Sequence, residues 1–139
     1  MGLSPYYLAD TSALARRSVA AVAVRLDPLL EAGLVARCSI TDLEGGFSSR
    51  SPAARRRMRA ERAAWLAPMS QEVLNRAVEV QDRLAARSKL RGAKIADLLI
   101  AAAAEANGLV VLHYDRDFDL ISEITQQPTE WIVPAGTVP

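Results

Sequence analysis

The sequence has 139 residues, a length that fits one domain with a real hydrophobic core. Half of the residues are hydrophobic, and 17 basic against 16 acidic side chains leave a net charge of +1. This balance predicts a folded, soluble globule and excludes a protein that binds nucleic acid through its overall charge. Any contact with nucleic acid must therefore come from local patches of charge.

Cysteine content and hydropathy indicate the cellular compartment of the protein. Cys38 is the only cysteine, so no internal disulfide can form and a reducing compartment is favoured. The most apolar stretch, residues 95–104, is interrupted by Asp97 and is too short to span a membrane. The N-terminus has no basic region followed by an apolar core, so no secretory signal is predicted. We expect one cytoplasmic domain over residues 1–139, with a loose leader at about residues 1–5.

An apolar strand followed at once by an acid opens the predicted fold. Residues 6–9 have the length and composition of a short buried strand, which ends at Asp10. A short helix is expected next, with Thr11 or Ser12 as its N-terminal cap.

A helix, a second strand and a further helix start are predicted after this. Residues 19–32 form the helix, because Gly33 supplies the left-handed conformation that ends many helices. Residues 34–40 resemble a strand. The segment from Thr41 to Glu44 has the capping-box pattern, so a new helix is expected to begin there.

Two serines mark the starts of the next two helices. Ser51-Pro52 places a cap before a proline at the first helical position, and this helix is predicted to end near Leu66. Ser70 begins the second, in which apolar residues recur at helical spacing: Val73, Ala77, Val80 and Leu84.

The last third of the chain predicts a buried helix and two strands. Residues 95–107 form an almost wholly apolar helix that Gly108 closes, and residues 109–112 are an apolar run typical of a central parallel strand. Residues 115–118 form a turn, and residues 131–133 supply a late strand. This alternation of strands and helices predicts an α/β domain with a parallel sheet.

Asp97 is the most informative residue, because the other side chains from residue 95 to residue 104 are apolar. A buried ionised carboxylate is too costly unless it is paired or bound to a metal. The alternative is structural: Asp97 lies near the start of its helix, where the helix dipole tolerates an acid.

Three other acids have comparable alternatives. Asp10 fits a helix cap, Glu44 fits the capping box, and Asp115 fits a turn or a cap. As a set they are harder to explain structurally, because all of them and Asp97 can converge at one edge of the sheet. Parallel sheets bind ligands at the carboxyl ends of their strands, and Asp10 and Asp115 directly follow two strands. Repulsion among close carboxylates is relieved by a divalent cation, and oxygen ligands favour Mg²⁺ or Mn²⁺.

Three segments and one isolated acid resemble PIN-domain toxins of the VapC type. The segments are residues 7–13 (YLADTSA), 94–101 (KIADLLIA) and 111–118 (VLHYDRDF), and the isolated acid is Glu44. The four acids are separated by 34, 53 and 18 residues, in the order and spacing typical of this family. The resemblance covers nearly the whole chain. Its specific parts are the segments around Asp97 and Asp115.

The resemblance implies a three-layer PIN-like α/β fold with a central parallel sheet of four to five strands flanked by helices. It also implies a metal-dependent endoribonuclease, the toxin of a toxin–antitoxin pair with a VapB-type antitoxin, and commonly a homodimer. Asp10, Glu44, Asp97 and Asp115 are then the catalytic and metal-binding acids, and Asp117 is a fifth acid. Thr11 and Ser12 support the site by hydrogen bonds.

The expected chemistry is hydrolysis of RNA by water that a metal ion activates, with metal charge stabilising the transition state. His113, the only histidine, is expected to pack or cap at the end of its strand, since this chemistry needs no protein base. No Gly-rich phosphate loop is present.

A helix rich in arginine is the chief basic feature. Such a run is often only a solvated surface. The functional interpretation is a wall that contacts RNA phosphates beside the metal site. Its candidate residues are Arg16 and Arg17, which follow Asp10, together with Arg55, Arg59 and Arg62.

Three other functions compete with the toxin. A receiver-like signalling domain also binds Mg²⁺ with clustered acids, but it places paired acids after its first strand, where this chain has only Asp10. A PIN-fold protein that has lost turnover would act only by binding. An RNA-processing nuclease would work without an antitoxin.

Overall fold

A computed structural model describes residues 4–62, 64–88 and 92–139. Four short strands form one sheet in the order β2-β1-β3-β4, and each neighbouring pair is parallel. The bounds of the strands are β1 Tyr7–Ala9, β2 Val35–Ala36, β3 Val110–His113 and β4 Thr129–Trp131. The four-stranded parallel sheet agrees with the expectation from sequence.

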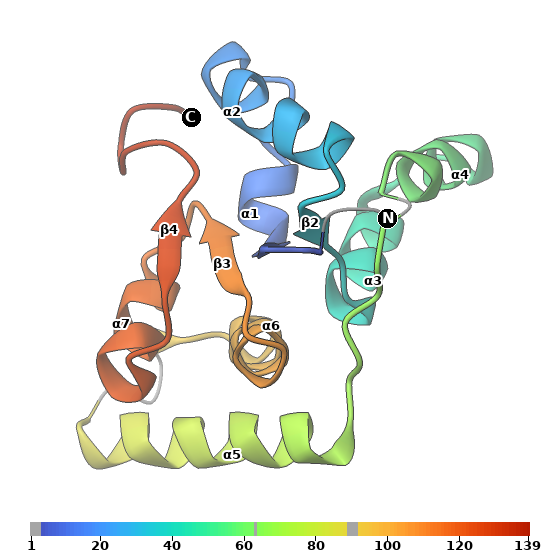
Figure 1. Ribbon diagram of the computed structural model, residues 1–139. Helices are drawn as coiled ribbons and strands as arrows, with labels where there is room; N and C mark the ends of the chain where they lie inside the picture. Colours follow the sequence, from blue (N-terminus) through green and yellow to red (C-terminus); the bar gives the residue numbers. More distant parts are fainter. Residues whose placement is uncertain (1–3, 63, 89–91) are drawn as a thin grey trace.

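Seven helices surround this sheet in the described part of the chain (Figure 1). In Figure 1, α5 runs along one side of the molecule and α6 lies end-on between α5 and the sheet. The bounds are α1 Thr11–Leu14, α2 Ala20–Glu31, α3 Ser39–Ser48, α4 Pro52–Glu61, α5 Gln71–Ala86, α6 Ile95–Ala106 and α7 Asp117–Thr125.

Alternation along the strands divides the core into two layers. Leu8 and Val111 face a cluster built mainly from α5, α6 and α7, whereas Leu112 faces a smaller cluster with Val22 and Leu26 of α2. Successive strand residues point to opposite faces, so a strand with helices on both sides must be apolar throughout. All four residues of β3 are buried, as this requires. The fold therefore has three layers, with the sheet in the middle.

The predicted helix starts at the two serines are correct. The side chain of Ser51 accepts a hydrogen bond from the backbone N–H of Ala54, and Ser70 accepts one from Val73. Gly33 and Gly108 adopt the left-handed conformation, with φ values of 72° and 65°, directly after the ends of α2 and α6. Local sequence signals therefore set these boundaries.

The prediction for residues 34–44 was wrong in detail. The second strand has only two residues, and α3 begins at Ser39 rather than after Thr41. Thr41 is the third residue of α3, and its hydroxyl donates a hydrogen bond to the carbonyl oxygen of Cys38 at 3.0 Å. Glu44 is therefore an interior helical residue and no part of a capping box, which removes its structural explanation.

Three further expectations need correction. Asp10, and not Thr11 or Ser12, caps α1, since its carboxylate accepts the backbone N–H of Ser12 at 2.9 Å. Helix α4 ends at Glu61, short of Leu66. Helix α7 was not predicted, and its first two residues, Asp117 and Phe118, lie within the turn expected at residues 115–118. Its buried residues recur every three positions, a signal that was present in the sequence: Phe118, Ile121 and Ile124.

None of the helices in the described residues is both long and apolar enough to cross a bilayer. Of the expected loose leader, residues 1–3 lie outside the described residues, and Ser4 and Pro5 belong to no helix or strand.

Candidate metal centre

Three carboxylates meet where α6 begins and β3 ends. One oxygen from each of Asp97, Asp115 and Asp117 lies within 4.8 Å of the other two. Asp97 comes from the first turn of α6, Asp115 follows β3, and Asp117 is the first residue of α7. One carboxylate oxygen of Asp115 also accepts the backbone N–H of Asp117 at 2.9 Å, which fixes the turn between them. Asp115 is therefore both a turn residue and a member of the cluster.

Lys94 pairs with all three acids of this cluster. Its ammonium lies 2.8 Å from Asp117 Oδ2, 2.9 Å from Asp115 Oδ2 and 3.5 Å from Asp97 Oδ2. Hydrogen bonds to Asp117 and then to Asp115 raise the pKa of Lys94, so it stays charged at neutral pH. The lysine side chain is 68% exposed and can therefore swing away from the carboxylates. A cation is evidently favourable at this position.

Asp97 is the deepest of the three acids, at 5% exposure. Burial raises its pKa to about 8, and Asp117, Asp10 and Asp115 add to this shift. Its Oδ2 atom is buried without a hydrogen-bond partner among the described residues. This oxygen faces the Lys94 ammonium at 3.5 Å but forms no hydrogen bond, so the helix N-terminus, the structural alternative, does not satisfy it.

Asp117 behaves in the opposite way. Its burial alone would raise its pKa, but hydrogen bonding with Asp97 and the ion pair with Lys94 outweigh burial and hold the pKa below its usual value. The pair therefore favours a proton on Asp97 and a charge on Asp117 when no metal ion is bound.

Asp10 reaches the same edge of the sheet from β1, the neighbour of β3. Its backbone N–H donates to the carbonyl oxygen of Leu112 at 2.8 Å. The Ser12 hydroxyl donates to Asp10 Oδ2 at 2.5 Å and itself accepts the backbone N–H of Tyr114 at 2.8 Å. Burial raises the pKa of Asp10, against the lowering effect of Ser12, and the charge of Glu44 raises it further. Ser12 thus orients Asp10 and ties it to the segment after β3.

Glu44 enters from α3 and is held by the second predicted hydroxyl residue. Thr11 Oγ1 donates to Glu44 Oε1 at 2.8 Å. Glu44 lies outside the 4.8 Å cluster but acts electrostatically on Asp10. The structure therefore brings the five predicted acids to one region as a close trio, with Asp10 and Glu44 beside it.

His113 is fully buried and adds no side chain to the carboxylate cluster. Its ring packs against Phe118 and Trp131, with centroids 4.9 and 5.0 Å away. Burial lowers its pKa to about 4, so it is neutral, and its Nδ1 accepts the backbone N–H of Asp115 at 3.1 Å. The expected packing role at the strand end is correct.

The donor set suits a hard divalent cation. All five side chains offer carboxylate oxygens, which Mg²⁺ and Mn²⁺ prefer. The unpartnered Asp97 oxygen and the lysine ammonium among the carboxylates both indicate a place for positive charge. The residues therefore fit a divalent metal ion.

The arginines predicted to contact RNA fall into two groups. Arg16 donates to the carbonyl oxygens of Ser12 and Pro139, and Arg17 pairs with Asp27 at 2.7 Å. Arg62 turns inward, is half-buried, and donates to the carbonyl oxygen of Thr41 at 3.1 Å. These three bind other parts of the chain. Arg55 and Arg59, on α4, are exposed.

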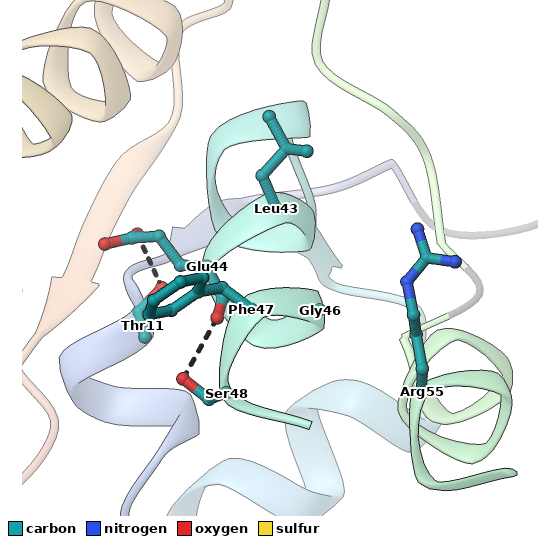
Figure 2. Close-up of a pocket in the computed structure, with 7 residues that line it drawn as sticks. All are labelled: Thr11, Leu43, Glu44, Gly46, Phe47, Ser48 and Arg55. Atoms are coloured by element: carbon teal, nitrogen blue, oxygen red, sulfur yellow. Dashed lines mark hydrogen bonds between the residues drawn. The ribbon is translucent and has the colours of Figure 1, made fainter. Parts of the chain in front are cut away.

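Sequence reasoning missed a groove beside Glu44. Figure 2 shows its lining, with Thr11 and Glu44 on one side and Arg55 on the other. Phe47 projects into it and is 93% exposed. The available signal in the sequence was an aromatic residue three positions after an acid, on the same face of one helix.

The fold and the acidic site together define the class of protein. The family model described as the PIN domain matches residues 7–124. This match covers most of the chain, which belongs to the PIN-domain family.

Curated relatives place the chain in one branch of the PIN-domain family. Ribonuclease VapC51 of Mycobacterium tuberculosis is 53% identical over 133 residues, covering 95% of this chain and 96% of that protein. Ribonuclease VapC21 of the same organism is 47% identical over 133 residues, covering 94% and 96%. The chain therefore belongs to the VapC ribonucleases, and the resemblance seen in the sequence is confirmed.

Solved structures confirm the fold at much lower identity. DNA-bound VapBC from Salmonella typhimurium contains a chain that is 17% identical, with a TM-score of 0.71 and coverage of 93% of this chain and 99% of that one. VapBC-5 from M. tuberculosis gives 23% identity, a TM-score of 0.61, and coverage of 93% and 98%. The three-layer PIN-like fold is confirmed, and the receiver-like alternative is not favoured.

Proposed function

We propose that this chain is the toxin of a toxin–antitoxin pair, an endoribonuclease that cleaves cellular RNA with the help of a divalent metal ion. One observation carries the metal dependence: three carboxylates converge within 4.8 Å. The buried Asp97 oxygen that forms no hydrogen bond among the described residues supports it. Family membership among the VapC ribonucleases supports the nuclease activity.

Asp97, Asp115 and Asp117 would hold Mg²⁺ or Mn²⁺ through their carboxylate oxygens. Asp10 and Glu44 complete the acidic set, directly or through water. When bound, a divalent cation lowers the pKa of water and offsets the charge that develops on the phosphodiester during in-line attack.

The chain itself supplies orientation. Ser12 holds Asp10 through a hydrogen bond and fixes it against the strand end at Tyr114. Thr11 holds Glu44 in the same way from the start of α1. Such partners keep acidic ligands in a fixed geometry, and their loss costs activity even when every acid is present.

A VapB-type antitoxin is the proposed protein partner. Structural neighbours of this fold were solved as VapBC complexes, among them those from Salmonella typhimurium and Rickettsia felis. An RNA-processing nuclease without an antitoxin remains the contrasting function. Co-expression of the chain with the product of a small neighbouring gene decides between them, because a cognate antitoxin co-purifies and suppresses cleavage.

A homodimer and a cytoplasmic location complete the proposal. Exposed apolar side chains on α5 and α6 line a hollow of about 270 Å³ that a second copy could cover: Leu74, Val78 and Ile95. Sedimentation of the purified chain tests the dimer. Cytoplasmic RNA is the proposed substrate, consistent with a buried Cys38 thiol that forms no disulfide.

The decisive experiment is cleavage of a panel of transfer and ribosomal RNAs by the purified chain. We expect cleavage with Mn²⁺ or Mg²⁺ and none with EDTA. Asp10→Ala should remove the activity, and the fragments should carry 5′-phosphate and 3′-hydroxyl ends. Cleavage that persists in EDTA, or in the Asp10→Ala variant at the normal rate, would contradict the metal-dependent function.

A further inference from the structure

A groove of about 620 Å³ lies beside Glu44 and along α3 (Figure 2). Thr11 and Glu44, which are hydrogen-bonded to each other at 2.8 Å, form its inner end. Arg55 of α4 forms part of the opposite wall. The groove therefore adjoins Glu44, one of the five acids of the proposed metal site.

Phe47 is the unusual residue of this groove. It is 93% exposed, more than any other large hydrophobic residue in the described part of the chain. It follows Glu44 by three positions, so both side chains lie on one face of α3. An open aromatic ring beside a nuclease site offers a stacking surface for a nucleobase, which single-stranded RNA presents and a duplex does not.

Arg55 carries a positive charge, opposite in sign to the phosphates of RNA. Among the described residues it makes no ion pair with an acid, unlike Arg17. Its Nε atom would lie 3.2 Å from a Cβ placed at Gly46, so the absence of a side chain there lets the guanidinium pass over α3. Arg55 also lines an adjoining hollow with Arg50 and Arg56, which extends the positive surface away from the acids.

We propose that this groove is the subsite for an unpaired nucleotide next to the phosphodiester that is cut, with its base stacked on Phe47 and its phosphate paired with Arg55. This inference rests on the proposed nuclease function. Charge complementarity favours RNA as the occupant. The acids with their metal ion would bind the scissile phosphate, and the Phe47 ring would stack on a base. The exposed arginines of α4 would pair with the neighbouring phosphates.

The first test separates stacking from simple hydrophobic contact. Binding of a fluorescein-labelled single-stranded RNA of mixed sequence is measured by anisotropy in EDTA, so that nothing is cleaved. Phe47→Leu keeps an apolar side chain but removes the ring, and should weaken binding about tenfold. Phe47→Trp should bind at least as well as the wild type. Its added tryptophan fluorescence should be quenched by this RNA and not by the same RNA made with abasic sugars.

The second test uses two arginines of one helix. Arg57 is exposed on α4 and lines neither hollow, so Arg57→Gln removes the same charge as Arg55→Gln from a different place. Arg55→Gln should weaken RNA binding and lower the slope of log affinity against log salt by about one, as expected for one lost phosphate contact. Arg57→Gln should leave the slope unchanged. Equal effects of the two variants would overturn the subsite.

Other outcomes distinguish the subsite from the function on which it rests. If Phe47→Leu binds and cleaves RNA like the wild type, the subsite is wrong while the nuclease function stands. If the groove variants lose RNA binding but no form of the protein cleaves RNA with Mn²⁺, the nuclease function fails while the groove stands as an RNA-binding site. If Phe47→Leu leaves RNA binding unchanged and prevents capture of the antitoxin, the groove belongs to the antitoxin and the RNA subsite is overturned.

Discussion

The acidic edge of the sheet and the arginine-bearing helix α4 are built in opposite ways. Asp10 and Asp97 are 3% and 5% exposed, at the end of a buried strand and the start of a buried helix. Helix α4 has no buried residue, and its free arginines lie in solvent. Burial of the acids lowers the free energy of unfolding, whereas the exposed arginines change it very little.

This contrast separates two kinds of functional residue. Backbone topology forces the acids together before any ligand arrives, so their mutual repulsion is present in the metal-free protein and changes its stability. The exposed arginines act only when a polyanion approaches. Substitutions at the acidic edge should therefore affect activity and stability together, while those on the free face of α4 should affect RNA binding alone.

The largest effect is expected for Asp97→Asn. Loss of a charged ligand should lower the cleavage rate by about 100-fold or more. The metal-free variant should nevertheless melt at a higher temperature than the wild type at pH 8, because a buried carboxylate becomes a neutral amide. Cleavage assays and thermal melts in EDTA measure both. Asp82→Asn, an exposed acid of α5, is the control and should change neither. Wild-type cleavage by Asp97→Asn would contradict the proposed role.

The stability of the metal-free protein should fall as pH rises from about 6.5 to about 8. The folded protein keeps a proton on Asp97 up to a pKa of about 8, while the unfolded chain loses it near 3.8. The stability that this group provides below 3.8 is therefore lost progressively until pH 8.

The pH range is chosen to exclude His113. Its pKa is lowered to about 4 from 6.5, so it adds a dependence of opposite sign, but only below pH 6.5. Thermal melts in EDTA measure the effect, and Asp97→Asn should remove it. Saturating Mn²⁺ should weaken or reverse this fall of stability with pH, because the ion requires ionised ligands. A melting temperature in EDTA that rises over this range would contradict the raised pKa.

Two arginines at the end of α4 sharpen the comparison: Arg59 lies in its last turn and Arg62 directly follows it. Arg62 is half-buried and donates to the carbonyl oxygen of Thr41, whereas Arg59 is exposed. Arg62→Ala should lower the free energy of unfolding by about 1–3 kcal/mol, because a charged hydrogen bond is lost. Arg59→Ala should change it by less than about 0.5 kcal/mol. Urea unfolding of both variants provides the measurement, and equal losses would contradict the inward role of Arg62.

The smallest effect is expected for Lys94→Met. Lys94 neutralises the carboxylates when no ion is present, but it is 68% exposed and its contribution is screened by solvent. Its removal should lower the melting temperature in EDTA slightly and strengthen Mn²⁺ binding by less than about fivefold, because a competing cation is gone. Calorimetric titration with Mn²⁺ tests this. Weaker Mn²⁺ binding would indicate that Lys94 supports the metal site instead of competing with the ion.

The sequence by itself determined the parts of this protein that depend on neighbouring residues. Apolar runs ending in acids predicted β1 and β3 with Asp10 and Asp115 at their ends, and Ser51 and Ser70 predicted two helix starts. The acid Asp97 within the apolar first part of α6 indicated a site because burial makes an unpaired carboxylate costly. These features are local or follow from the general rule for parallel sheets.

Only the tertiary structure decided which side chains bond to other parts of the chain and which remain exposed to solvent. Arg16 bonds to Pro139, 123 positions away, and Thr11 bonds to Glu44 across 33 positions. The sequence offered Arg62 and Arg55 as equivalent members of one basic helix, yet one turns to the backbone of α3 and the other lines the groove with Phe47. Periodicity describes one helix at a time, whereas the partner of a long side chain depends on how separate helices pack against each other.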